Sequence, residues 1–170
     1  ERVAQRLGLI TKAPDLAEWR GIVRRIVEPR HRVRIAVVGK YTDYVDSYKS
    51  VQEALIHGGI ANDVGVDIDW ISSDLFTDAD RAREILGAYD GLLVPGGFGV
   101  RGVEGMVEAI RAARETRLPF FGICLGMQTA IIEFARNVCG IADSHSSEFA
   151  PECANAVISL MESQQHVTDM

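Results

Sequence analysis

The sequence predicts an α/β domain built on an open parallel β-sheet. Four short apolar runs have the length and composition of buried strands, and segments with helical apolar spacing separate them. This alternation of strands and helices favours a parallel sheet with right-handed crossovers. Glycine-containing turns follow two of the strands, and ligands of such sheets bind at the carboxyl ends of the strands. We therefore expect a binding site where those two turns meet.

The first 31 residues do not look like the start of such a domain. Apolar spacing predicts a short helix over residues 3–10 and a second helix over residues 15–26, which Pro29 ends. The first strand follows only after this segment. We therefore place the α/β domain at residues 32–170 and expect residues 1–31 to lie outside it.

The elements of the domain then follow in order. Strands are predicted at 33–38, 64–71, 92–94 and 120–123, from β-branched runs or strict alternation. Helices are predicted over 47–57, from about 77, over 106–114, and from the residue after Cys124 to about 135. Gly58-Gly59 should stop the first of these helices. Residues 157–161 could form another strand, and residues 163–170 show no pattern.

Composition and charge narrow the class of protein. The 170 residues are 47% hydrophobic and 25% charged, as in an ordinary globular domain, and the net charge of −6 argues against a general nucleic-acid surface. Three cysteines without paired spacing suggest a reducing compartment. No apolar run approaches the length of a membrane span, so we expect a cytoplasmic protein. No cluster has metal-ligand spacing, and no phosphate-binding loop is present.

The most informative stretch is Gly122-Ile123-Cys124-Leu125-Gly126, where a predicted strand turns into a predicted helix. This is the pattern of a nucleophile elbow, in which a reactive side chain occupies a strained turn. The dipole of the following helix favours a thiolate, and its first N–H groups can bind an oxyanion. An isolated cysteine is more often a buried structural residue. The flanking glycines favour a nucleophile here, whereas Cys139 and Cys153 are interpreted as structural.

A cysteine nucleophile that attacks a carbonyl carbon also requires an oxyanion hole. The backbone N–H groups of Leu125 and Gly97 are candidates, because a glycine lets the backbone approach a substrate closely. The five glycines between Gly96 and Gly105 suggest a mobile flap, although a simple turn would explain one or two of them. Gln128 lies one helical turn after Cys124, either toward the site or on the surface.

Several segments together resemble a known family. They are residues 38–41, 48–51, 95–105, 122–128 and 146–149. In combination they resemble the glutaminase domain of the CTP synthase family, within the class I glutamine amidotransferases. The resemblance extends from the first residues to about residue 160. It implies a flavodoxin-like sheet that is incomplete at its C-terminal end, and it makes residues 1–31 the end of a synthetase domain with its linker.

The resemblance also implies roles for individual residues. Cys124 would attack the side-chain amide of L-glutamine, and Glu148 would bind its α-amino group. The residues of the turn after Cys124 would belong to the glutamine site; they are Leu125, Gly126, Met127 and Gln128. Spacing alone would not have identified Glu148, because an exposed loop is the usual place for a glutamate.

The general base is missing from this pattern. The class uses a His-x-Glu motif near the end of the domain, and none of the four histidines is followed by glutamate at that spacing; they are His31, His57, His145 and His166. The family's downstream arginine that binds the substrate carboxylate also has no counterpart. We therefore expect the isolated chain to lack glutaminase turnover.

For a parent enzyme the resemblance implies more partners. Ammonia would pass to a synthetase domain that aminates UTP to CTP with ATP and Mg²⁺, with no cofactor in the glutaminase domain itself. GTP would act as an allosteric effector near Phe98–Glu104, and the parent would be a homotetramer.

Two alternatives stay open. One is another cysteine-elbow hydrolase of the superfamily, which should carry histidine where Leu125 stands; the other is a non-catalytic assembly module.

Missing strands should also leave an exposed sheet edge.

Overall fold

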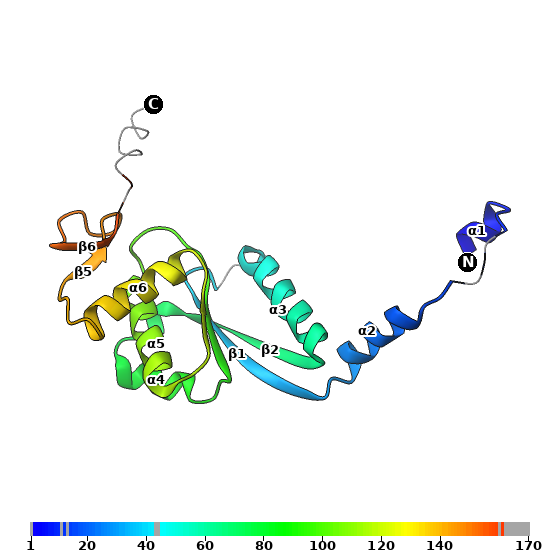
Figure 1. Cartoon of the computed structure of the whole chain (residues 1–170), viewed down its shortest axis with the longest axis horizontal. Helices are drawn as coiled ribbons and strands as arrows, with labels where there is room; N and C mark the ends of the chain where they lie inside the picture. The colour runs from blue at the N-terminus through cyan, green and yellow to red at the C-terminus, as the bar shows by residue number, and fades with distance from the viewer. Residues whose placement is uncertain (1, 11, 13, 43–44, 160, 162–170) are drawn as a thin grey trace, which may run out of the picture.

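The computed structural model describes residues 2–10, 12, 14–42, 45–159 and 161, and a parallel β-sheet lies at its centre (Figure 1). The strands are β1 (His31–Gly39), β2 (Val64–Ser72), β3 (Gly91–Val94) and β4 (Phe120–Gly122). Their order across the sheet is β2-β1-β3-β4, and all three pairings are parallel. This order matches the first four strands of the flavodoxin-like arrangement. The predicted open α/β fold is therefore confirmed.

Helices cover both faces of this sheet. Helix α3 (Lys49–Asn62) lies on one side, and α4 (Ala79–Leu86), α5 (Val103–Thr116) and α6 (Leu125–Asn137) lie on the other (Figure 1). Alternate residues of β1 and β3 face the second group, since strand side chains alternate between faces. Ala36, Val38 and Val94 are fully buried there against Met106 of α5. The core thus lies directly below the carboxyl ends of the two central strands.

The structure overturns the prediction that Gly58 and Gly59 stop the helix after β1. Helix α3 continues to Asn62, and Asp63 closes it in the left-handed conformation with φ of 58°. Gly59 is needed for packing, because a Cβ at that position would lie 2.5 Å from the carbonyl oxygen of Val64 in β2. A Cβ on Gly58 would meet open space. The glycine pair therefore marks a close approach of helix and strand.

Helix α5 begins at Val103, three residues before the predicted start at Met106. A Cβ on Gly102 or Gly105 would overlap Ser73, in the short 3-10 helix η2 (Ser73–Leu75). Gly105 lies inside α5 and is needed for packing, so interpreting it as part of a mobile flap was wrong, whereas Gly102 ends the loop before α5 with φ of 73°. The loop between β3 and α5 is limited to residues 95–102, and it contains the exposed Phe98.

Two short helices precede the sheet, as predicted. They are α1 (Arg2–Arg6) and α2 (Ala17–Val27), and they extend away from the sheet (Figure 1). The carboxylate of Asp63 links α2 to the end of α3, because it pairs with Arg24 at 3.2 Å and with Arg30 at 3.1 Å. The side of α2 that carries Trp19 and Val23 is exposed.

The chain after α6 forms a separate two-stranded parallel sheet. Its strands are β5 (Ser144–Ser146) and β6 (Asn155–Ile158), and it lies beside α6 (Figure 1). The predicted strand over 157–161 is therefore present but starts and ends earlier. The polar stretch 163–170 lies outside the described residues. A remaining 3-10 helix, η1 (Val45–Tyr48), leads into α3.

Candidate active site

Cys124 occupies a strained turn between β4 and α6. Its backbone has φ of 52° and ψ of −107°, a conformation that L-residues rarely adopt. Such a conformation costs about 1–3 kcal/mol and persists only where the surroundings enforce it. Here the N–H of Ile123 donates to the carbonyl of Val94 at 2.9 Å, and that of Gly126 donates to the carbonyl of Ile123 at 2.9 Å. The turn leaves Cys124 exposed at the end of the sheet.

The two glycines of the elbow are required by packing on either side of the cysteine. A Cβ on Gly122 would lie 2.6 Å from the backbone of Gly126, and a Cβ on Gly126 would overlap the carbonyl of Val94. Helix α6 can therefore start directly against β3 and β4 only if both positions lack side chains. The Gly-x-Cys-x-Gly spacing places the first turn of α6 immediately behind the thiol.

The predicted oxyanion donors lie close to Cys124. A Cβ built on Gly96 would lie 3.9 Å from the Cys124 sulfur, and one on Gly97 would lie 3.2 Å from the side chain of Leu125. The N–H of Leu125 is the first of α6, and N–H groups of a first turn have no acceptor within their own helix. The structure thus brings Cys124, Gly97 and Leu125 together from two separate loops.

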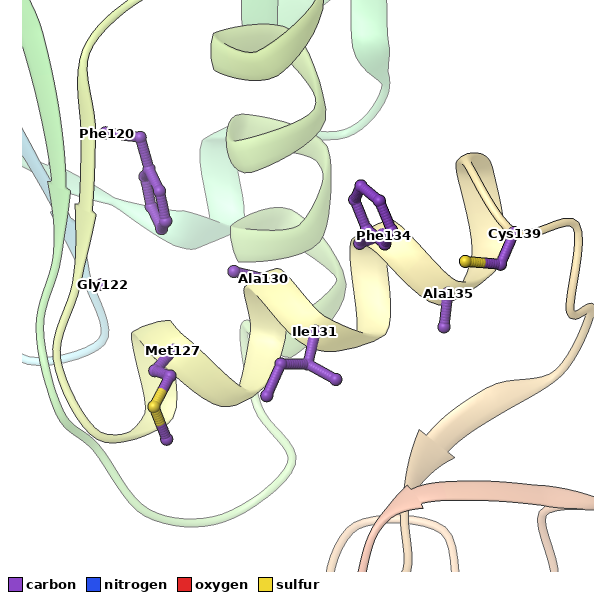
Figure 2. A pocket seen from close by; sticks show the side chains of 8 residues that line it. All are labelled: Phe120, Gly122, Met127, Ala130, Ile131, Phe134, Ala135 and Cys139. Atoms are coloured by element: carbon purple, nitrogen blue, oxygen red, sulfur yellow. The ribbon is translucent and has the colours of Figure 1, made fainter.

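The other predicted residues of the turn point in different directions. Gln128 is half-buried, and its backbone N–H donates to the carbonyl of Cys124 at 3.0 Å. The side chain of Met127 instead lines an apolar groove of about 460 Å³ beside β4 (Figure 2). That groove is bounded by Phe120, Gly122, Met127, Ala130, Ile131, Phe134, Ala135 and Cys139. Cys124 is not among them, so the groove and the elbow are neighbouring but separate features.

Lys40 is a residue of this region that sequence reasoning did not select. It follows β1 directly and is only 5% exposed. Its ammonium group donates to the carbonyl of Phe98 at 3.2 Å and to that of Gly99. Burial lowers the pKa of this lysine, and the neighbouring Arg101 lowers it further. A charged residue directly after a central strand, at the carboxyl edge of the sheet, was the available signal.

Glu148 lies near this lysine, in the turn after β5. It is exposed, and its backbone N–H donates to the hydroxyl of Ser146 at 3.2 Å. Its carboxylate acts on Lys40 as a nearby opposite charge that raises the lysine's pKa, against the larger effects of burial and of Arg101. The ring of Phe149 lies 5.6 Å from the ammonium group. The turn that carries Glu148 and Phe149 therefore lies near Lys40 and the loop after β3.

None of the three histidines in the described part of the chain is seen in contact with Cys124. The Nε2 atom of His145 lies 3.4 Å from the carboxylate of Glu104 in α5, and its Nδ1 atom accepts from the N–H of Ser146 at 2.9 Å. Arg136 joins the same carboxylate at 2.7 Å and so links α5, α6 and β5. His31 is exposed at the opposite, amino end of β1, and His57 is exposed on α3. His166 lies outside the described residues.

Two further properties concern only the described part of the chain. No group of three or more histidine, cysteine, aspartate and glutamate side chains there could hold a metal ion. None of the helices described above has both the length and the apolar character needed to cross a membrane.

Comparisons with known proteins give a consistent picture. The model of the family "Glutamine amidotransferase class-I" matches residues 43–169. A CTP synthase from Geobacter sulfurreducens is 52% identical over 168 residues, and one from Ruminiclostridium cellulolyticum is 53% identical over 168 residues. These alignments cover 98% and 99% of this chain but only 31% of each relative. The chain therefore spans about a third of the length of the curated relatives it matches.

A solved structure is similar as well. It is the glutaminase domain of Trypanosoma brucei CTPS with bound acivicin, with a TM-score of 0.75 and 43% sequence identity. The similarity covers 80% of this chain and 53% of that chain.

Proposed function

Since the chain belongs to the class I glutamine amidotransferases, we propose that it carries the nucleophile-bearing part of a glutaminase site. Its substrate would be L-glutamine, which is split into glutamate and ammonia. The observation that carries this proposal is the strained Cys124, with Gly96 and Gly97 of a second loop packed beside it and beside Leu125. A structural cysteine would not need that backbone conformation or that exposure.

The chemistry follows from the elbow geometry. The Cys124 thiolate attacks the side-chain carbonyl carbon of glutamine, and the N–H groups of Gly97 and Leu125 stabilise the oxyanion. The C–N bond then breaks, ammonia leaves with the proton released from the thiol, and a γ-glutamyl thioester remains. Water hydrolyses the thioester to glutamate and restores the thiol. Each histidine in the described structure is either far from the elbow or engaged with Glu104 and Ser146, so we assign none of them as the base.

Recognition of glutamine would use the residues around the elbow. The backbone from Leu125 through Met127 borders the site, and Gln128 lies on the same face of α6. Glu148 supplies a carboxylate for the α-amino group, an ionic contact that would favour a free amino acid over a peptide. The position of the neighbouring residue supports this assignment, because the ring of Phe149 lies 5.6 Å from the Lys40 ammonium group, which binds the loop after β3.

For the parent enzyme we propose CTP synthesis, on the strength of about 50% identity to curated CTP synthases. The ammonia would aminate UTP in an ATP- and Mg²⁺-dependent synthetase domain of the same cytoplasmic enzyme. GTP as effector near Phe98–Glu104 and a homotetrameric assembly are part of the same proposal. Residues 1–31 would then be the link between the two domains, and residues 32–170 would belong to the glutaminase domain.

The decisive test is labelling with 6-diazo-5-oxo-norleucine, an electrophilic analogue of glutamine that alkylates a thiol with loss of N₂. Peptide mass spectrometry should find one adduct, on Cys124, with Cys139 and Cys153 unmodified. Iodoacetamide serves as the control reagent, because it should also react with the exposed Cys139. Equal labelling of the three thiols by the analogue, or none, would contradict the proposed site.

Turnover is a separate question from labelling. No His-x-Glu sequence occurs in the 170 residues, so we expect the chain alone to release glutamate from glutamine no faster than Cys124→Ala. An enzymatic glutamate assay checks this directly. A clear Cys124-dependent rate would mean that another group in the chain serves as the base.

A further inference from the structure

Lys40 is buried at the edge of the sheet where the proposed glutaminase site lies. We infer that Lys40 is a positioning residue: its ammonium group fixes the Gly96–Gly99 loop so that the Gly97 N–H faces the substrate carbonyl beside Cys124. This inference rests on the proposed function. It assigns a role to a side chain that the chemistry described above does not use.

The contacts of the lysine side chain support this role. The ammonium group donates to the carbonyls of Phe98 and Gly99, and a Cβ on Gly97 would lie 3.4 Å from its Cδ atom. One side chain therefore binds two consecutive residues of the loop, Phe98 and Gly99, and its stem lies beside a third, Gly97. Because a carbonyl lies in one peptide plane with the N–H of the following residue, these two bonds orient the planes that carry the N–H groups of Gly99 and Val100. Holding those two planes limits how far the chain can turn at the preceding Gly97, and with it the direction of the Gly97 N–H group.

The backbone of Lys40 is itself held from two sides. Its N–H donates to the hydroxyl of Tyr48 at 3.3 Å, and its carbonyl accepts from the guanidinium of Arg101 at 2.6 Å. Tyr48 is in turn stacked on Trp70, with ring centroids 5.4 Å apart. Because its backbone is held at the end of β1, Lys40 can hold the loop after β3 in a fixed position relative to that strand.

Stability alone does not explain a lysine here. A buried ammonium group loses hydration, which lowers the pKa of Lys40, and the nearby Arg101 repels it. An apolar side chain would avoid the cost of burying this charge, although it would leave the two loop carbonyls without this donor. The charge of Lys40 is therefore better explained by the two loop carbonyls that it orients than by a gain in the stability of the fold.

The same ammonium group also lies next to the turn that carries Glu148. The ring of Phe149 is 5.6 Å from it, and the carboxylate of Glu148 is close enough to act on its pKa. The lysine therefore connects the loop proposed to bind the oxyanion with the turn proposed to bind the α-amino group. We expect both ends of a bound glutamine to depend on this one side chain.

The test compares labelling rates of Cys124 by 6-diazo-5-oxo-norleucine in the 170-residue chain and in Lys40→Met. Methionine retains an unbranched apolar side chain, one atom shorter than that of lysine, and removes the charge, so we expect labelling to slow about tenfold through misplacement of the loop. The rate with iodoacetamide, which needs no oxyanion hole, should change less than about twofold. Lys12→Met makes the same substitution at an exposed lysine and should leave both rates unchanged. Lys40→Arg retains a cationic donor and should recover most of the analogue rate.

The possible outcomes separate the two proposals. Failure of the analogue to label wild-type Cys124 would remove the proposed function. Selective labelling of the wild type with an equal rate in Lys40→Met would overturn only the role of Lys40. An equal fall in the iodoacetamide rate would also overturn it, because the thiol itself would then have changed. If circular dichroism shows that the methionine variant does not fold, Lys40→Gln replaces it. Glutamine is neutral and can donate to one of the two carbonyls at a time. An unchanged rate of labelling by the analogue in this variant would again refute the role of Lys40.

Discussion

At the scale of single residues, the site depends on backbone conformation more than on side-chain bonding. Cys124 is exposed, and its proposed role as nucleophile rests on a positive φ that its neighbours enforce. The glycines at 122 and 126 are the neighbours that permit it, because any side chain there would collide with α6 or β3. The strained backbone is therefore that of Cys124, and the packing at positions 122 and 126 maintains its conformation.

The strain at position 124 predicts an unusual order of stability among variants. Cys124→Gly should have a free energy of unfolding about 1 kcal/mol higher than Cys124→Ala, because glycine adopts a positive φ without penalty. Urea titration followed by tryptophan fluorescence measures the difference. At Cys139, whose φ is not positive, the order should reverse. An alanine variant at 124 as stable as the glycine variant would show that the turn is not strained.

The sequence predicted part of this site directly. Cys124, Leu125 and Gly97 were identified because strand ends and glycine spacing can be read from a pattern, and the structure places them together. Glu148 came only from the family resemblance, since its approach to the site depends on the turn after β5. Lys40 was missed because a lysine is expected at the surface, and its burial results from a loop 58 residues away in sequence.

At the scale of elements, close approaches between helices and strands decide where glycines occur. Prediction located every helix and strand of the main sheet but misplaced the end of α3 and the start of α5. In both cases a glycine that had been interpreted as a helix stop or as part of a flap, Gly59 or Gly105, proved to be a packing residue. Sequence alone cannot distinguish these roles, because the second depends on the distance to a segment elsewhere in the chain.

The adjacent glycines of α3 provide a paired test of this interpretation. Gly58→Ala should raise the free energy of unfolding by up to about 1 kcal/mol, because the new methyl group meets open space inside a helix. Gly59→Ala should lower it by about 2 kcal/mol, because the methyl group would press on the carbonyl of Val64. Thermal and urea unfolding of both variants give the comparison. Equal effects of the two substitutions would contradict the packing role of Gly59.

At the scale of the whole molecule, the two edges of the sheet differ in character. On the β2 side, Arg34 of β1 pairs with Asp69 of β2 at 2.8 Å, and Arg32 similarly contacts Asp67. Charged residues of this kind discourage edge-to-edge pairing. On the β4 side, no strand of the described residues pairs with the outer edge, and Phe121 is 63% exposed. The apolar groove of Figure 2 adjoins this second edge.

This asymmetry predicts that the isolated chain self-associates through the β4 side. Sedimentation velocity should show a concentration-dependent shift to larger species. Phe134→Lys, which puts a charge on the exposed groove wall, should shift the equilibrium toward monomer by about tenfold, as expected for the loss of one large apolar contact. Trp19→Lys, on the exposed face of α2, is the matched control and should have little effect. A wild-type chain that stays monomeric at high concentration would refute the prediction.

The packing role of the elbow glycines also bears on how such a motif changes during evolution. Gly122 and Gly126 are needed for α6 to lie against the sheet, whether or not the thiol performs any chemistry. A descendant that had lost its activity would therefore still keep both glycines under selection for folding. Its position 124 would instead drift toward glycine, the residue that adopts this positive-φ conformation without a Cβ clash. A relative that keeps both flanking glycines has therefore kept the packing of α6 on the sheet. Only the residue at position 124 indicates whether it has also kept the reaction.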